Sequence, residues 1–151
     1  MTKPMRTAAE AEQAVDSLSG VIEQLRALLE EETALVHAGR LRAAAALGPA
    51  KAALAAELFA GGEVLKANAK FLLQAAPGRC AAFNRLQDAV RAVLQRNMTV
   101  LATAHAVSEG IVRRLSGDLA RKSSPQVYGA TGRTVAPGPR HGRPLAVSRV
   151  L

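Results

Sequence analysis

The chain has 151 residues, enough for one domain, and its 49% hydrophobic content is largely alanine, with 3% aromatic residues and no tryptophan. This composition excludes a thick globular core and favours long helices that pack closely along their lengths. The formal net charge is +8: residues 1–63 carry −3 (nine acidic, six basic) and residues 64–151 carry +11 (three acidic, fourteen basic). A basic half can attract nucleic acid, an anionic membrane or an acidic protein, and charge alone does not decide among them.

The first predicted element is a helix over residues 8–38, after a loose start. Its apolar residues recur at steps of three and four, which places them on one helical face. They are Val15, Leu18, Ile22, Leu25 and Leu29. Ala38 and Gly39 predict the end of this helix, because glycine tolerates the left-handed conformation that closes many helices. The run Glu30, Glu31 and Glu32 is typical of a solvated helix face and is not a catalytic carboxylate pair.

A second helix is predicted over residues 40–76, with leucines at a recurring seven-residue spacing that suits a coiled-coil seam. These leucines are Leu47, Leu54, Leu58, Leu65 and Leu72. Pro49 lacks an amide hydrogen and crowds the preceding turn, so we expect a kink or short break near Leu47 and Gly48, with Pro49 opening a fresh segment. Gly61 and Gly62 mark a second weak point, and Pro77 and Gly78 mark the clearest interior stop.

Lys51 falls on the apolar seam of this second helix, at the heptad place of Leu58 and Leu65. The simpler interpretation is a lysine whose stem is packed while its amine reaches water. The alternative is a specific pair with Glu31 or Glu32 across the hairpin, which would fix the register of the two helices.

The third predicted helix, residues 79–121, is the longest. Its apolar face consists of Phe83, Leu86, Val90, Val93, Leu101, Ala104, Ile111, Leu115 and Leu119. At a rise of 1.5 Å per residue it would approach about 60 Å, more than a compact globule of this size can bury. We therefore expect part of it to lie against the other helices and the rest to protrude or to be covered by a partner.

Composition changes in the last thirty residues, which hold four of the seven prolines and five basic residues but no acidic residue. Such a segment cannot bury enough apolar surface to fold alone. The sequence thus predicts an all-α protein: an elongated antiparallel three-helix hairpin with coiled-coil-like packing over residues 8–121, and a flexible, disordered basic tail over residues 122–151.

The residue types that carry catalysis or metal binding do not form a recognisable arrangement. His37, His105 and His141 are far apart in the sequence, so no two of them have the spacing of metal ligands. Cys80 is the single cysteine, so an intrachain disulfide cannot form. The glycines of residues 129–134 lack the Gly-Lys-Ser/Thr ending of a phosphate loop. We expect no enzymatic activity, no cofactor, no metal and no small-molecule substrate.

The start of the chain shows no secretory signal, and the single cysteine suits a reducing compartment. The longest apolar run, Leu41 to Ala60, is mostly alanine and is interrupted by Arg42, Pro49, Lys51 and Glu57. Alanine is too weakly hydrophobic for a bilayer span. We expect a cytoplasmic protein without a transmembrane segment.

Several motifs together resemble the FlgN family of flagellar export chaperones. They are the run Leu28 to Leu35 with Ala38-Gly39-Arg40-Leu41, then Lys51 and Leu54, then Asn97, Leu101, Ala104 and Gly110-Ile111, and finally the segment Val127 to Arg133. The likeness covers about residues 15–133. Each motif alone has low specificity, whereas their order and spacing together count for more.

The resemblance implies a cytoplasmic chaperone without ATPase activity that binds hook-filament junction proteins and delivers them to components of the flagellar type III export apparatus. It places substrate contact on the later part of the third helix and the segment after it. The partner-binding residues would be Ile111, Val112, Leu115, Leu119, Val127 and Tyr128.

Other interpretations of the same residues stay open. The seam could be buried in a self-associating structural coiled coil, or packed within the chain. The basic end (Arg113, Arg114, Arg121, Lys122) could bind nucleic acid or a membrane surface. Nucleic acid is the weaker idea, because Tyr128 is the one aromatic residue available for base stacking in the tail.

Overall fold

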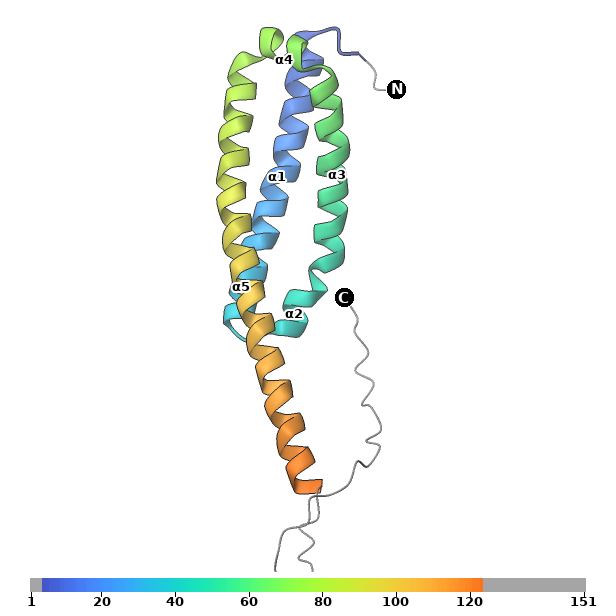
Figure 1. Ribbon diagram of the computed structural model, residues 1–151. Helices are drawn as coiled ribbons and strands as arrows, with labels where there is room; N and C mark the ends of the chain where they lie inside the picture. The colour runs from blue at the N-terminus through green and yellow to red at the C-terminus, as the bar shows by residue number, and fades with distance from the viewer. Residues whose placement is uncertain (1–3, 124–151) are drawn as a thin grey trace, which may run out of the picture. The chain divides into compact units, whose positions relative to one another are not determined.

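The computed structural model describes residues 4–123, and every regular element in this range is a helix (Figure 1). The helices are α1 (Ala8–His37), α2 (Leu41–Ala46), α3 (Gly48–Ala67), α4 (Ala69–Ala75) and α5 (Pro77–Ser123). The all-α bundle prediction is confirmed for this part of the chain. Most of the predicted tail lies outside the described residues. The chain divides into two compact units, residues 1–107 and residues 108–151.

Helix α1 begins and ends at two well-formed caps. At its start the Thr7 hydroxyl accepts a hydrogen bond from the Glu10 amide, and the Glu10 carboxylate accepts one from the Thr7 amide, both at 3.2 Å. At its end Gly39 has a φ of 71°, the left-handed conformation that glycine adopts without strain. The Arg40 amide bonds the Leu35 carbonyl and the Gly39 amide bonds the Val36 carbonyl, which is a Schellman motif. The predicted stop at Ala38 and Gly39 is confirmed.

The predicted second helix is interrupted twice. The expected break near Leu47 is confirmed: this residue lies between the end of α2 and the start of α3, and Pro49 lies in the first turn of α3. The predicted weak point at Gly61 and Gly62 does not interrupt the helix, since both residues lie inside α3. The chain breaks instead at Asn68, whose side-chain amide donates to the Val64 carbonyl at 2.9 Å while its oxygen accepts from the Met5 amide at 2.9 Å. Asparagine competes in this way with helical backbone bonds.

Pro77 and Gly78 also act differently from the prediction. The interruption falls at Ala76, and Pro77 is the first residue of α5. Proline suits this position because the first amide of a helix has no intrahelical partner and the fixed φ of proline is already helical. The stop that the sequence indicated is therefore the start of the longest helix.

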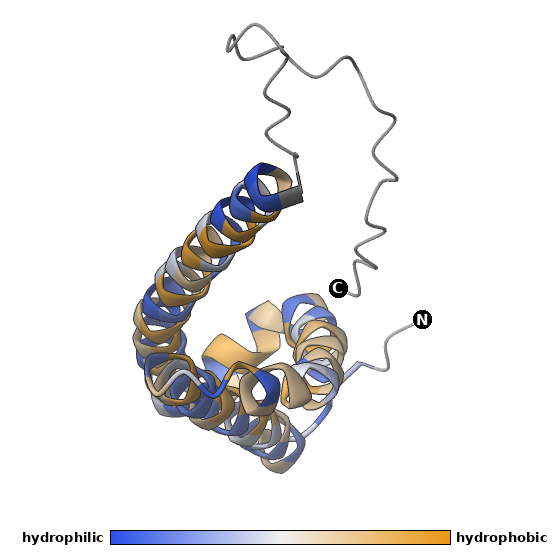
Figure 2. Ribbon diagram, turned by 90° about the horizontal axis from the view of Figure 1, so that it is seen from below, coloured by the Kyte–Doolittle hydropathy of each residue, from blue (hydrophilic) through white to orange (hydrophobic). Residues whose placement is uncertain are grey.

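The core of the first unit is narrow and is organised around α1. This helix contacts α2, α3 and α4, and supplies most of the buried apolar side chains. At one end Ala11 and Val15 pack with Leu72 and Ala76 in a cluster that excludes water. By contrast α3 has no fully buried residue. Seven of its twenty residues are alanine, and charged residues interrupt the apolar ones, so blue ribbon is mixed with tan and orange along the helices in Figure 2.

One stretch of the described chain, Leu41–Ala67, is long and apolar enough to cross a membrane by length and composition alone. This stretch comprises α2 and α3, which are separated at Leu47. Within it the Lys51 ammonium is bonded to a carboxylate of α1, which ties α3 to the bundle.

Helices α1 and α3 approach each other closely at Gly61. A Cβ atom at this position would lie 2.5 Å from Leu18 Cδ1, whereas a Cβ atom at Gly62 would have no such neighbour within 4 Å. At this distance the Leu18 side chain would have to shift to admit the new atom. The missing side chain at Gly61 therefore permits the contact between the two helices.

The two glycines give a matched pair of substitutions. Gly61→Ala should lower the free energy of unfolding by about 1–3 kcal/mol, because the new methyl group overpacks against Leu18. Gly62→Ala should raise it by about 0.5–1 kcal/mol, because alanine loses less backbone entropy than glycine in a helix. Urea denaturation followed by circular dichroism measures both. If both substitutions changed the free energy of unfolding in the same direction, the close approach of α1 and α3 at Gly61 would be contradicted.

Candidate functional site

The second unit presents a row of exposed aliphatic side chains on α5. Ile111 and Val112 are each 54% exposed, Leu115 is 58% exposed and Leu119 is 62% exposed. Their steps of three and four place them on one side of the helix. Isolated exposed apolar residues are ordinary, but a contiguous row of large ones marks an interaction surface. We call these four residues the α5 stripe.

The charges around the α5 stripe are mostly basic. Two exposed pairs follow the helical period: Glu109 with Arg113 at 3.6 Å and Asp118 with Arg121 at 3.0 Å. Such exposed pairs add at most about 0.5 kcal/mol each to helix stability. Arg114 and Lys122 add further positive charge to this part of α5. The stripe is therefore apolar with a basic surround.

The structure locates four of the six predicted partner-binding residues, those of the α5 stripe. They occupy one continuous helix, as the period of the sequence predicts, and none is covered within residues 108–122. Val127 and Tyr128 lie outside the described residues.

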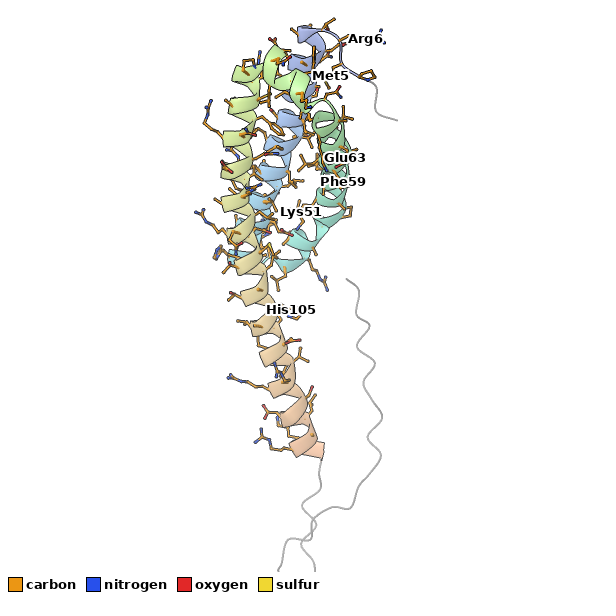
Figure 3. The ribbon with its side chains drawn as sticks, turned by 45° about the horizontal axis from the view of Figure 1, so that its top comes forward. Met5, Arg6, Lys51, Phe59, Glu63 and His105 are labelled. Atoms are coloured by element: carbon orange, nitrogen blue, oxygen red, sulfur yellow. The ribbon has the colours of Figure 1, made fainter. Side chains whose placement is uncertain are left out.

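A buried polar junction joins three helices of the first unit. The Lys51 ammonium (labelled in Figure 3) donates to both carboxylate oxygens of Glu32, each at 2.7 Å. Asn97 Nδ2 donates to Glu32 Oε2 at 2.9 Å and also reaches the Leu29 carbonyl and the Thr33 hydroxyl, each at 3.2 Å. These side chains come from α1, α3 and α5. We call Lys51, Glu32 and Asn97 the polar junction.

Burial makes the polar junction energetically important. Glu32 is 5% exposed and Asn97 is 2% exposed, and the Lys51 side chain is 26% exposed. Within residues 4–123 every buried side-chain nitrogen and oxygen atom has a hydrogen-bond partner. A buried charge with satisfied partners is tolerated, whereas one that loses its partner is costly.

The polar junction answers one question that the sequence left open and corrects one sequence-based prediction. Lys51 forms the specific pair between α3 and α1, and Glu32 is its partner. The expectation of a fully solvated glutamate run is wrong for Glu32, because its place on α1 faces α3 and α5, while Glu30 and Glu31 are exposed. Sequence reasoning did not identify Asn97 as a core group. The sequence signal for its burial was its position seven residues after Val90, which places the Asn97 side chain on the apolar stripe of that helix.

The groups that could carry chemistry stay separate in the described part of the chain. Residues 4–123 contain no group of three or more His, Cys, Asp or Glu side chains placed to hold a metal ion. His37 and His105 are exposed on different helices, and the Cys80 thiol donates to the Leu72 carbonyl at 3.6 Å. His141 and the glycines of residues 129–134 lie outside this range.

Removing one member of the polar junction should destabilise the first unit strongly. Lys51→Met leaves the buried Glu32 carboxylate without its cation, and the free energy of unfolding should fall by roughly 3 kcal/mol. The double variant Glu32→Leu with Lys51→Met should recover most of that loss, since no buried charge remains. Chemical denaturation of each variant measures this.

Lys66→Met is the matched control, because the Lys66 side chain is 80% exposed and its amine lies 3.8 Å from Glu63. Its effect should stay within about 0.5 kcal/mol. Equal effects at Lys51 and Lys66 would contradict a role for the junction.

Comparisons of the chain with protein-family models, with curated proteins and with solved structures found no match.

Proposed function

We propose that this chain is a cytoplasmic export chaperone. It would bind terminal helical segments of flagellar hook-filament junction proteins and deliver them to the flagellar type III export apparatus. The observation that carries the proposal is the α5 stripe, four large aliphatic side chains that are each more than half exposed on one side of a helix. The order of motifs that resembles the FlgN family supplies the class of client.

An amphipathic helix of a client is the natural cover for the α5 stripe. Burying one aliphatic side chain contributes about 1.5–3 kcal/mol, so leaving four of them in water forgoes a large part of the stability available to a small domain. A client helix with anchors at steps of three, four and seven can lie along such a row. Val127 and Tyr128 would extend the contact along the chain.

The finer architecture that we propose is an antiparallel three-helix hairpin with coiled-coil-like packing. Two contacts between α1 and α3 support it: Leu18 meets Gly61 and Glu32 meets Lys51, so residue numbers run in opposite directions. Two contacts between α1 and α5 support a third helix that runs back in the same direction as α1. Arg79 donates to Asp16 at 2.9 Å, and Asn97 donates to Glu32, so residue numbers increase together.

Substitution within the α5 stripe tests client binding. Leu115→Glu places a charge at its centre and should weaken binding of a junction-protein terminal segment by at least about 30-fold, as expected for a hot-spot residue. Leu73→Glu is the control, since Leu73 is 63% exposed but belongs to α4. Isothermal titration calorimetry at physiological salt measures both. Unchanged affinity of Leu115→Glu would remove the proposed site.

A structural self-associating coiled coil is the second candidate, because a copy of the same stripe could equally cover these aliphatic residues. Sedimentation of the protein alone separates the two. A monomer leaves the stripe available to a client, whereas a tight dimer that Leu115→Glu dissociates would favour the structural role. The third candidate, a basic nucleic-acid or membrane-surface binder, requires affinity that collapses as salt rises.

A further inference from the structure

The first unit contains an open apolar trough that the α5 stripe does not involve. Its volume is about 340 Å³, and its walls come from α1, α3 and the part of α5 before residue 95. Apart from Gln87 and Arg91 the lining is entirely aliphatic, aromatic or glycine. The lining includes Ile22, Leu25, Leu58, Val90, Arg91 and Leu94. Figure 1 shows α1 between α3 and this part of α5.

The described part of the chain leaves the trough unfilled. Leu25 and Leu58 are only partly buried, and Leu94 is 41% exposed. Three helices that meet along one seam leave room beside it for the side chains of a further helix at the usual spacing of about 8–10 Å.

Charge favours an acidic occupant. Arg91 is the single charged residue of the lining, and its side chain is 78% exposed. Its neighbour Asp88 is 3.7 Å away and 76% exposed, so this pair is weak and screened by solvent. Of the three walls α5 is the basic one: from residue 77 to residue 107 it carries four arginines and one aspartate, whereas α1 is acidic and α3 carries two lysines and two glutamates. A carboxylate that reaches Arg91 from a helix in the trough would gain a charge-assisted hydrogen bond.

The chain's own segments do not match this requirement. The sequence beyond residue 123 has four arginines and no acidic residue, so it would bring like charge to Arg91. The acidic helix α1 already uses its apolar face in the core, with Val15, Ile22 and Leu29 each 2% exposed. Neither the segment beyond residue 123 nor α1 therefore supplies the charge that the trough favours.

We propose that the trough binds an amphipathic helix of another protein, with a leucine-type apolar face and acidic flanking residues. This site is separate from the α5 stripe and does not depend on the proposed export function.

A displayed library of amphipathic helices tests the proposal on the full chain. The library has fixed leucines at positions i, i+3, i+7 and i+10, and flanking positions drawn equally from Glu, Lys, Gln and Ala. Selection should enrich Glu at the flanks. The affinity of a selected peptide should fall at least about tenfold in Leu94→Glu, and Arg91→Glu should move the preference from Glu to Lys.

Matched variants separate this site from other surfaces. Leu73→Glu and Leu115→Glu should keep the peptide affinity, because neither residue lines the trough. Both Leu94 and Arg91 are exposed, and circular dichroism of each variant should show an unchanged helical fold.

Three results would overturn the proposal: no enrichment, enrichment of Lys, or binding that Leu115→Glu abolishes while Leu94→Glu leaves it intact. The last result would place the peptide on the α5 stripe and would bear on the export function instead.

Discussion

The pairing of Lys51 with Glu32, completed by Asn97, is the interaction on which the arrangement of the first unit depends. Alanine and leucine faces pack in several registers at similar cost, because one leucine replaces another when a helix slides by seven residues. A buried carboxylate has no such freedom, since misalignment by one turn would leave it without a cation. The polar junction therefore selects one register for α1, α3 and α5. The close contact between Gly61 of α3 and Leu18 of α1 becomes possible only in that register.

The length of α5 links this packing to the proposed function. It has 47 residues, against 30 in α1 and 20 in α3. In the first unit its apolar face holds the buried Val90 and Asn97, and the same helical period continues to Leu115 and Leu119, which are exposed. A face that serves as core in one part of a helix and meets solvent in another is suited to transient cover by a client helix.

Sequence reasoning predicted the features that depend on helical period and on glycine. The stripe from Val15 to Leu29 and the left-handed Gly39 are two of them, because each is set by local geometry. The break at Asn68 was missed because it depends on a hydrogen bond to Met5, which is distant in sequence. The burial of Glu32 was missed because a run of three glutamates suggests a solvated face, although Glu32 lies three residues after Leu29 and so continues the buried stripe of α1. The trough could not be predicted, since an apolar stripe does not say whether its seam is filled.

Amide hydrogen exchange of the full chain, alone and with the terminal segment of a hook-filament junction protein, tests the central claim most directly. Protection should rise over residues 108–119, where the α5 stripe would be covered, and should stay unchanged over the buried face of α1, which is already shielded. Equal exchange over residues 108–119 with and without the segment would contradict the assignment of this face to client binding.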